Sequence, residues 1–193
     1  MSKGEETKQV ILEAGLKMAT QLSLESVTIG ALSKETRMSK SGLFAHFKSK
    51  ENLQLEILKH AGELFAEEVI FPALGEKAGI PRIKAVAGNW SRWSRKMTGG
   101  CIFIASSTEF SDRPGKVRDF IRTQQEMLVD SLRRVALSAI GAGDFRKGAD
   151  CDQFAFDLYS LMLGFHYYDR LLNHKDTRKH QDAALAQLLA NYA

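Results

Sequence analysis

The chain has 193 residues, 44% hydrophobic and 26% charged, which is enough for one large domain or two small ones with a sizeable core. Its net charge of +4 is a mild excess, compatible with an acidic partner but not diagnostic of one. The first residues lack the apolar segment of a signal peptide, and the longest apolar runs fall far short of the roughly 20 residues that span a bilayer. Together with two widely spaced cysteines, Cys101 and Cys151, these features predict a cytoplasmic protein with free thiols and no membrane segment.

The composition favours helices throughout. Proline occurs only at Pro72, Pro81 and Pro114, and the stretches between are rich in Ala, Leu, Lys, Glu and Gln, which are good helix formers. No segment alternates β-branched and polar residues as strands do. We therefore predict an all-α fold of about nine helices, at residues 5–22, 29–35, 40–45, 50–70, 81–96, 101–109, 114–139, 152–173 and 177–192.

Two short helices with a turn between them are expected at about residues 28–47. Thr28, Ser39 and Ser49 are good N-caps for the first short helix, the second short helix and the long helix that follows. Such a pair is the helix-turn-helix unit, whose second helix enters the major groove of DNA by its N-terminal residues. The segment therefore predicts a DNA-binding element.

The second short helix has a small, polar front and an apolar back. Leu43 and Phe47 form the back and are expected in the core. The front is formed by Lys40, Ser41 and Gly42. Helix starts after Ser39 and Ser49 would offer amide donors to phosphate, and Lys48 and Lys50 add charge beside them. The alternative is a core helix pair with a solvated basic face.

The stretch TIGALSKETRMSKSGLFAHFKSKENL, residues 28–53, resembles the DNA-binding segment of the TetR family of bacterial transcriptional regulators. The shared pattern is a helix-capping Thr28, an apolar Leu32, Ser39, then Leu-aromatic-x-His-Phe at 43–47 and Ser-Lys-Glu-x-Leu at 49–53. The stretch VILEAGLKMA, residues 10–19, resembles the family's first helix, and residues 99–120 resemble one branch of its ligand-binding domains.

The resemblance implies a helix-turn-helix domain at residues 1–52, within three N-terminal helices, and a ligand-binding and dimerisation domain at 53–193. The implied function is that of a homodimeric repressor that binds a palindromic operator in double-stranded DNA and is released by a small apolar or aromatic effector. No enzyme activity, cofactor or metal is expected. The expected DNA-binding residues are Thr28, Arg37, Ser39, Lys40, Ser41, Gly42, Phe44, His46, Lys48 and Lys50.

Three departures from the family pattern fall in this segment. Arg37 replaces the usual turn glycine, so either the turn differs or Arg37 adopts a left-handed conformation at a cost of about 1 kcal/mol. In the first case Arg37 would reach a phosphate. Ser33 replaces a usual alanine. Phe44 replaces a usual tyrosine, so the phenol-to-phosphate hydrogen bond often made in the family is not available.

The helix expected at 152–173 is apolar on two sides, so it needs to be covered on two sides. One side would pack on the chain's own core and the other on a second subunit; an entirely intramolecular core is the alternative. The resemblance implies a four-helix bundle across a two-fold axis. The expected interface residues are Phe154, Leu158, Leu161, Phe165, Leu185, Leu188 and Tyr192.

Several aromatic residues lie on segments that surround the effector pocket in the family. The candidate ligand-binding residues are Trp90, Trp93, Phe103, Phe110, Phe165 and His166. The alternative for each is an ordinary core role, and for Cys101 a buried structural thiol is favoured over a redox role.

Two other functions compete with a sequence-specific regulator. A chromosomal binder without sequence preference would show steep salt dependence and little discrimination between DNA sequences. A small-molecule-binding protein or enzyme is less favoured, because the sequence has no paired carboxylates, metal-spaced His/Cys set, phosphate loop or Ser/His/Asp grouping.

Overall fold

The computed structural model describes residues 3–193, and within that range every regular element is helical. The elements are α1 (Lys3–Gln21), α2 (Ile29–Thr36), α3 (Lys40–Phe47), α4 (Lys50–Phe65), a π-helical turn η1 (Ala66–Ile70), α5 (Phe71–Leu74), α6 (Ile80–Lys96), α7 (Ile102–Phe110), α8 (Lys116–Ala142), α9 (Cys151–Arg170) and α10 (Thr177–Ala190). Because α4, η1 and α5 follow one another without a loop, the described chain has nine separate helical segments. The all-α prediction is confirmed, and most helix ends lie within three residues of their expected places.

The described chain packs as two compact units. The first contains residues 3–65 and 95–124, and the second contains residues 66–94 and 125–193. The first unit therefore combines the N-terminal helices with α7, although α7 comes from the part of the sequence assigned to the larger domain. The predicted division at residue 52 does not coincide with these units.

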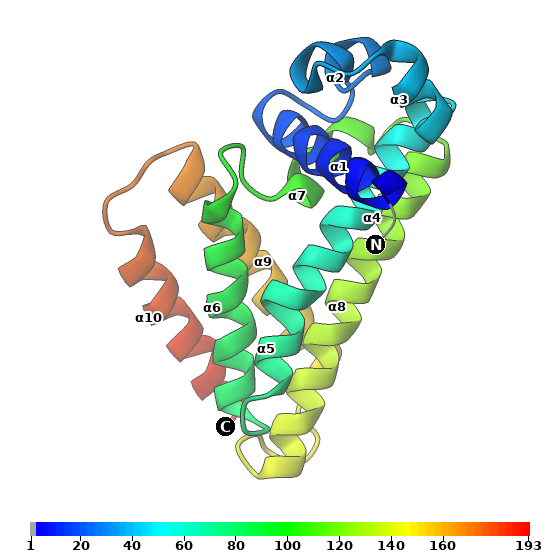
Figure 1. Cartoon of the computed structure of the whole chain (residues 1–193). Coiled ribbons are helices and arrows are strands. Elements are labelled where there is room, and N and C mark those ends of the chain that lie inside the picture. The colour runs from blue at the N-terminus through cyan, green and yellow to red at the C-terminus, as the bar shows by residue number, and fades with distance from the viewer. Residues whose placement is uncertain (1–2) are drawn as a thin grey trace. The chain divides into compact units, whose positions relative to one another are not determined.

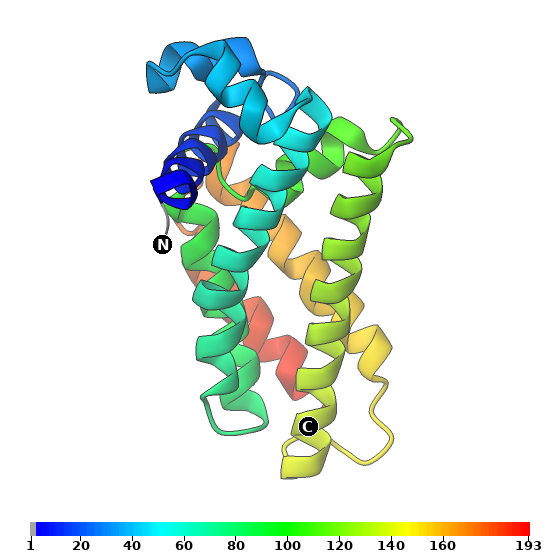
Figure 2. The same ribbon diagram turned by 45° about the vertical axis from the view of Figure 1, so that its right-hand side comes forward.

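The core of the first unit lies between α1, α2, α3 and α4. Figure 2 shows α2 and α3 crossing one end of α1 and the beginning of α4. A side chain cannot be added at Gly15 without a shift, because a Cβ there would lie 2.6 Å from Cδ1 of Ile57. The fully buried apolar side chains at this contact are Ile11, Leu32, Leu43, Phe47, Leu53 and Ile57.

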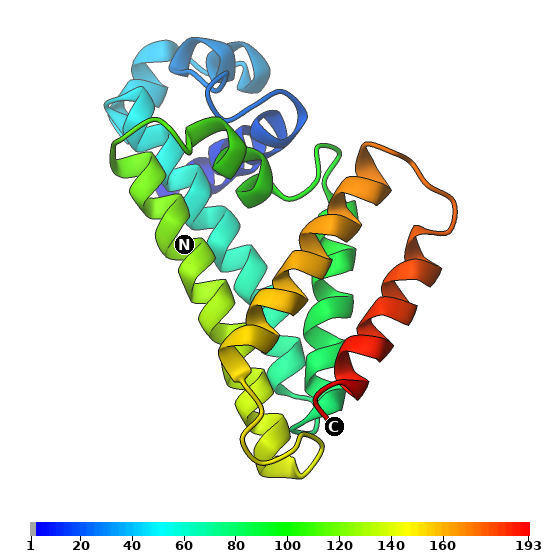
Figure 3. The ribbon, with the colours of Figure 1, turned by 180° about the vertical axis from the view of Figure 1, so that it is seen from behind.

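The second unit contains η1, α5, most of α6, the C-terminal part of α8, α9 and α10. Figure 3 shows α9 and α10 as a neighbouring pair joined by the loop at residues 171–176. At their far end, the Phe154 ring lies 5.0 Å from both the Phe145 and the Tyr192 rings. The Tyr192 hydroxyl donates to Asp157 at 3.0 Å. Burial, together with this carboxylate, raises the pKa of Tyr192 to about 12. This cluster holds the end of α10 on α9.

The structure corrects the predicted subunit interface. Five of the seven residues, Phe154, Leu158, Phe165, Leu185 and Tyr192, are buried by the chain's own residues and are not available to a partner. Leu161 and Leu188 are half-buried. The sequence identified the apolar sides of the last two helices but assigned the inner side to the partner.

No helix between residues 3 and 193 is both long and apolar enough to cross a membrane.

Candidate nucleic-acid interface

All three predicted N-caps are present in the first unit. Oγ1 of Thr28 accepts from the amide of Ala31 at 3.0 Å at the start of α2. At the starts of α3 and α4, Oγ of Ser39 accepts from Gly42 N at 3.1 Å, and Oγ of Ser49 accepts from Asn52 N at 3.0 Å. Each hydroxyl satisfies one amide that the first helical turn leaves without a partner. These caps therefore set where the two short helices and α4 begin.

The turn between α2 and α3 has the left-handed conformation that glycine normally provides. Arg37 ends α2 with φ 57° and ψ 24°, and its side chain is exposed. Of the two alternatives that the sequence left open, the structure thus has the left-handed one. Oγ of Ser33 donates to the carbonyl of Met38 at 2.7 Å and so spans the turn from α2. Lys48, which ends α3, also has a positive φ of 61°.

Helix α3 buries two side chains and exposes the rest. Leu43 and Phe47 have no exposed surface, as the sequence predicted. The other residues of α3 are solvent-exposed: Lys40, Ser41, Gly42, Phe44, Ala45 and His46. Phe44 is 57% exposed, an unusual surface for a large aromatic side chain in a small helix. The helix therefore presents a polar, basic N-terminal half and one aromatic ring, the surface expected of a recognition helix.

The two lysines that follow α3, which the sequence grouped together, differ in their surroundings. Lys48 is exposed, whereas Nζ of Lys50 forms an ion pair with Glu25 at 2.5 Å. Arg113 lies 3.6 Å from the other oxygen of Glu25. The hydrogen bond from Lys50 lowers the pKa of Glu25, and burial opposes this only in part. Lys50 therefore holds the loop before α2, and its role as a phosphate ligand stays a prediction.

Helix α7 is attached to the loop between α1 and α2, a contact that the sequence did not predict. The carboxylate of Glu109, on the last turn of α7, accepts from the amides of Leu24 at 3.0 Å and Glu25 at 2.8 Å. Nε2 of Gln54, on α4, donates to the Leu24 carbonyl at 2.9 Å. Figure 1 shows α7 beside α1.

The loop before α7 also lies against α1. A Cβ at Gly99 would lie 1.1 Å from the carbonyl oxygen of Thr20, so only glycine fits this approach. Both ends of α7 are thus fixed to the C-terminal part of α1 and the loop that follows it. The residues involved are 79 to 85 positions apart, so local sequence patterns contain no signal for this attachment.

The structure places four of the six predicted ligand-binding residues in the second unit and two, Phe103 and Phe110, in the first. Three of them meet in the second unit, where the Trp90 ring lies 6.4 Å from Phe165 and 6.5 Å from His166. Nδ1 of His166 is 2.8 Å from Oγ of Ser94, and burial lowers the pKa of this imidazole.

The other three predicted ligand residues are also buried. Phe103 packs on Phe65 at 6.1 Å in the first unit, and Phe110 lies under the guanidinium of Arg113 at 5.6 Å. Trp93 is buried on α6. Their role as ligand contacts remains a prediction.

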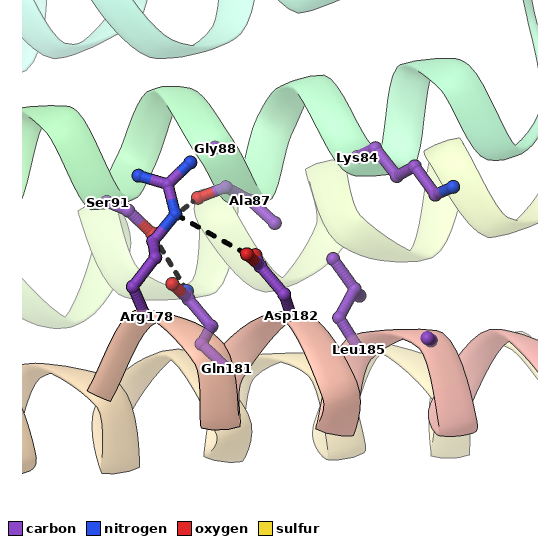
Figure 4. A pocket seen from close by; sticks show the side chains of 9 residues that line it. Lys84, Ala87, Gly88, Ser91, Arg178, Gln181, Asp182 and Leu185 are labelled. Atoms are coloured by element: carbon purple, nitrogen blue, oxygen red, sulfur yellow. Dashed lines mark hydrogen bonds and ion pairs between the residues drawn. The ribbon is translucent and has the colours of Figure 1, made fainter. Parts of the chain in front are cut away.

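The second unit has pockets beside α10. The pocket between α6 and α10 has a volume of about 300 Å³ and a charged rim of Lys84, Arg178 and Asp182 (Figure 4). On its floor, Nε2 of Gln181 donates to Oγ of Ser91 at 2.8 Å (Figure 4). A more apolar groove of about 380 Å³ runs between α9 and α10, and its lining includes Phe165.

Among residues 3–193, no group of three or more His, Cys, Asp or Glu side chains is arranged so that it could hold a metal ion. Cys101 and Cys151 are buried, and they form no disulfide within the described residues. Burial raises the pKa of the Cys151 thiol, which lowers its reactivity.

Comparison with known proteins agrees with this site. The family model described as "Bacterial regulatory proteins, tetR family" matches residues 11–57. The model described as "Tetracyclin repressor-like, C-terminal domain" matches residues 79–185. No curated protein matches the chain.

Solved structures share the fold at low sequence identity. A TetR transcriptional regulator from Chloroflexus aurantiacus J-10-fl is 22% identical with a TM-score of 0.86, over 98% of this chain and 96% of that one. AibR in complex with isovaleryl coenzyme A and operator DNA is 21% identical with a TM-score of 0.72, over 94% and 97% of the two chains. A protein from Saccharomonospora viridis in complex with choline is 19% identical with a TM-score of 0.76, over 93% and 95%.

The two family models together cover most of the chain, and the residues that the first one matches include the helix-turn-helix with its three caps. The chain therefore belongs to the TetR family of DNA-binding transcriptional regulators, a family of non-enzymatic proteins.

Proposed function

We propose that the chain acts as a homodimeric repressor, binding a palindromic operator and leaving it when a small molecule binds. The observation that carries the proposal is the recognition helix α3. It is anchored by the buried Leu43 and Phe47 and exposes Lys40 and Ser41 at its N-terminal end. A helix of this kind inserts its first turn into the major groove, where lysine reaches base edges or phosphates.

A second copy of the chain is the proposed occupant of the outer face of α9. Phe156, Tyr167 and Leu171 are 66%, 61% and 70% exposed and recur at the spacing of one helical face. Tyr168 and Leu172 beside them are also exposed. Such an apolar stripe supports an isologous contact with the same stripe of a second copy. A two-fold dimer would present two α3 helices to two half-sites.

The proposed effector is a small apolar or aromatic molecule. Two similar structures contain small molecules, isovaleryl coenzyme A in one and choline in the other. In this chain α7 belongs to the residues matched by the C-terminal family model, yet Glu109 at its end holds the loop before α2. A ligand that moves α7 would therefore disturb the α1–α2 loop. A ligand can shift DNA affinity only as far as it prefers one of the two states.

Footprinting on the DNA that flanks the protein's own gene tests this proposal. We expect one protected palindrome and an apparent Kd at least about 1,000-fold tighter than for a random duplex at the same salt concentration. A chromosomal binder without sequence preference would instead protect no discrete site and bind both duplexes alike. Sedimentation of the protein with a duplex that carries one palindrome measures the number of subunits bound, and a single subunit would contradict the dimer.

A further inference from the structure

The turn before the recognition helix contains a non-glycine residue in a conformation that glycine prefers. Arg37 has φ 57° and ψ 24°, where the Cβ of an L residue is crowded by its own backbone. The Arg37 side chain is exposed, so burial of that side chain does not compensate for the crowding. Something else in the first unit has to hold the turn in this shape.

One side chain spans the turn. Oγ of Ser33, in the middle of α2, donates to the carbonyl of Met38 at 2.7 Å. Met38 directly precedes Ser39, the N-cap of α3. The bond therefore connects the body of α2 to the backbone from which the recognition helix starts, and both Ser33 and Met38 are half-buried, where a hydrogen bond is less exposed to water.

Helix α3 has few other restraints at this end. Its only two buried side chains are Leu43 and Phe47, in its middle and at its C-terminal end. The N-terminal turn with Lys40, Ser41 and Gly42 is exposed, and no side chain of that turn is buried. The backbone of residues 37–39 thus sets the direction in which the first turn of α3 points.

We propose that Ser33 is a positioning residue for operator recognition, which holds the start of α3 through the Met38 carbonyl and maintains the left-handed turn at Arg37. The proposal rests on the proposed function, because it concerns which DNA the helix reads. Without the hydroxyl, the turn samples other shapes and only a fraction of molecules presents α3 correctly. The apparent operator affinity is the intrinsic affinity multiplied by that fraction. Binding to random DNA depends on phosphate charge and changes little.

The test compares Ser33→Ala with Thr36→Ala. Both variants remove one side-chain hydrogen bond of α2, but Oγ1 of Thr36 donates to the Leu32 carbonyl within the helix and not across the turn. The probes are a duplex selected from a random library by the wild-type protein and an unselected duplex of the same length. We expect Ser33→Ala to weaken binding to the selected duplex about five- to tenfold, the effect of one net hydrogen bond, with random-duplex binding nearly unchanged and a melting temperature lower by no more than about 2–4 °C. Thr36→Ala should bind both duplexes as the wild type does.

Two rescue variants separate positioning from general destabilisation. Ser33→Thr keeps a hydroxyl and should restore binding to the selected duplex. In the Ser33→Ala background, Arg37→Gly removes the Cβ that disfavours the left-handed conformation and should also restore it, so the two substitutions are strongly non-additive. The proposal is overturned if Ser33→Ala keeps the full preference for the selected duplex, or if its affinity for both duplexes falls by the same factor. It is also overturned if neither rescue substitution restores affinity for the selected duplex. If the wild type selects no preferred duplex at all, it is the proposed function that fails.

Discussion

The two ends of the recognition helix carry lysines in different settings. Lys40 is the first residue of α3, whereas Lys48 follows its last turn with a positive φ, and both are exposed. By their positions on a recognition helix, we expect Lys40 to reach base edges and Lys48 to reach the DNA backbone.

Replacing each lysine with alanine should separate these roles. Lys40→Ala should relax sequence preference at one base pair, with a cost of about 1–3 kcal/mol on the preferred site. Lys48→Ala should weaken all duplexes alike and reduce the slope of log K against log salt by roughly one unit. Binding measurements over a salt series on single-base operator variants distinguish the two. Equal, sequence-independent losses would contradict base reading by Lys40.

His166 should make the stability of the second unit depend on pH. Burial lowers the pKa of its imidazole from the ordinary 6.5, with a smaller contribution from Arg170, while Asp169 acts in the opposite direction. Because the folded pKa is the lower one, the unfolded chain takes up the proton first as pH falls. The stability that the neutral, buried His166 contributes is therefore complete above about pH 6.5 and falls as the pH drops below that value. The total loss is about 1.4 kcal/mol for each unit by which the folded pKa lies below the unfolded one.

Unfolding by urea at pH 7.5 and pH 5 measures this contribution. Replacing His166 with Gln keeps a hydrogen-bonding side chain opposite Ser94 but removes the titration. We expect the wild type to lose more stability than His166→Gln over this range. An equal loss in both proteins would show that the acid response comes from other groups.

At the scale of elements, α7 is the helix that attaches to α1 and to the loop between α1 and α2. The Glu109 carboxylate, at the C-terminal end of α7, accepts hydrogen bonds from two backbone amides. The close approach of Gly99 to Thr20 fixes the loop before the N-terminal end of α7. The loop that Glu109 holds leads directly into Thr28, the N-cap of α2.

Glu109→Gln should loosen this attachment with little change in side-chain shape. The neutral amide has one acceptor oxygen where the carboxylate has two, so at least one charge-assisted bond is lost. We expect a loss of about 1.5–3 kcal/mol in unfolding free energy, together with weaker operator binding in the absence of effector. Thr108→Ala is the control, since Thr108 bonds only to the Ile104 carbonyl of its own helix. Wild-type operator affinity and stability in Glu109→Gln would rule out this role for α7.

For the whole molecule, the outer stripe of α9 predicts how two copies associate. Tyr167→Glu would place a carboxylate within the stripe, where an unpaired charge is costly to bury. We expect monomers in light scattering, an intact helical circular dichroism spectrum, and operator binding weaker by about 100-fold or more, because one half-site loses the second tethered contact. Leu137→Glu, on an exposed part of α8 outside the stripe, is the matched control. A Tyr167→Glu variant that stays dimeric would exclude this face of α9 as the interface.

Much of the DNA-binding element could be predicted from the sequence because its determinants are local. Thr28, Ser39 and Ser49 each bond to an amide three residues later, and that spacing can be read directly from the chain. The burial of Leu43 and Phe47 follows from their four-residue spacing on a short helix that is otherwise small or polar. The family resemblance rests on the same residues, and the family matches support it.

Only the tertiary structure decided which neighbours distant residues meet. The sequence marked α9 as apolar on two sides, but Phe154 and Leu158 were assigned to the partner although the chain's own helices cover them. The local sequence of a helix that is apolar on two sides does not show which side faces the core of the chain. That depends on where α6 and α10 pack against α9. The same limit applies to the pairing of Lys50 with Glu25 and to the hold of Glu109 on the α1–α2 loop, whose partners are 25 and about 85 residues apart. Helix caps and helical periodicity involve residues only three or four positions apart, so they can be predicted from the sequence. The contacts between distant residues form only when the helices pack together.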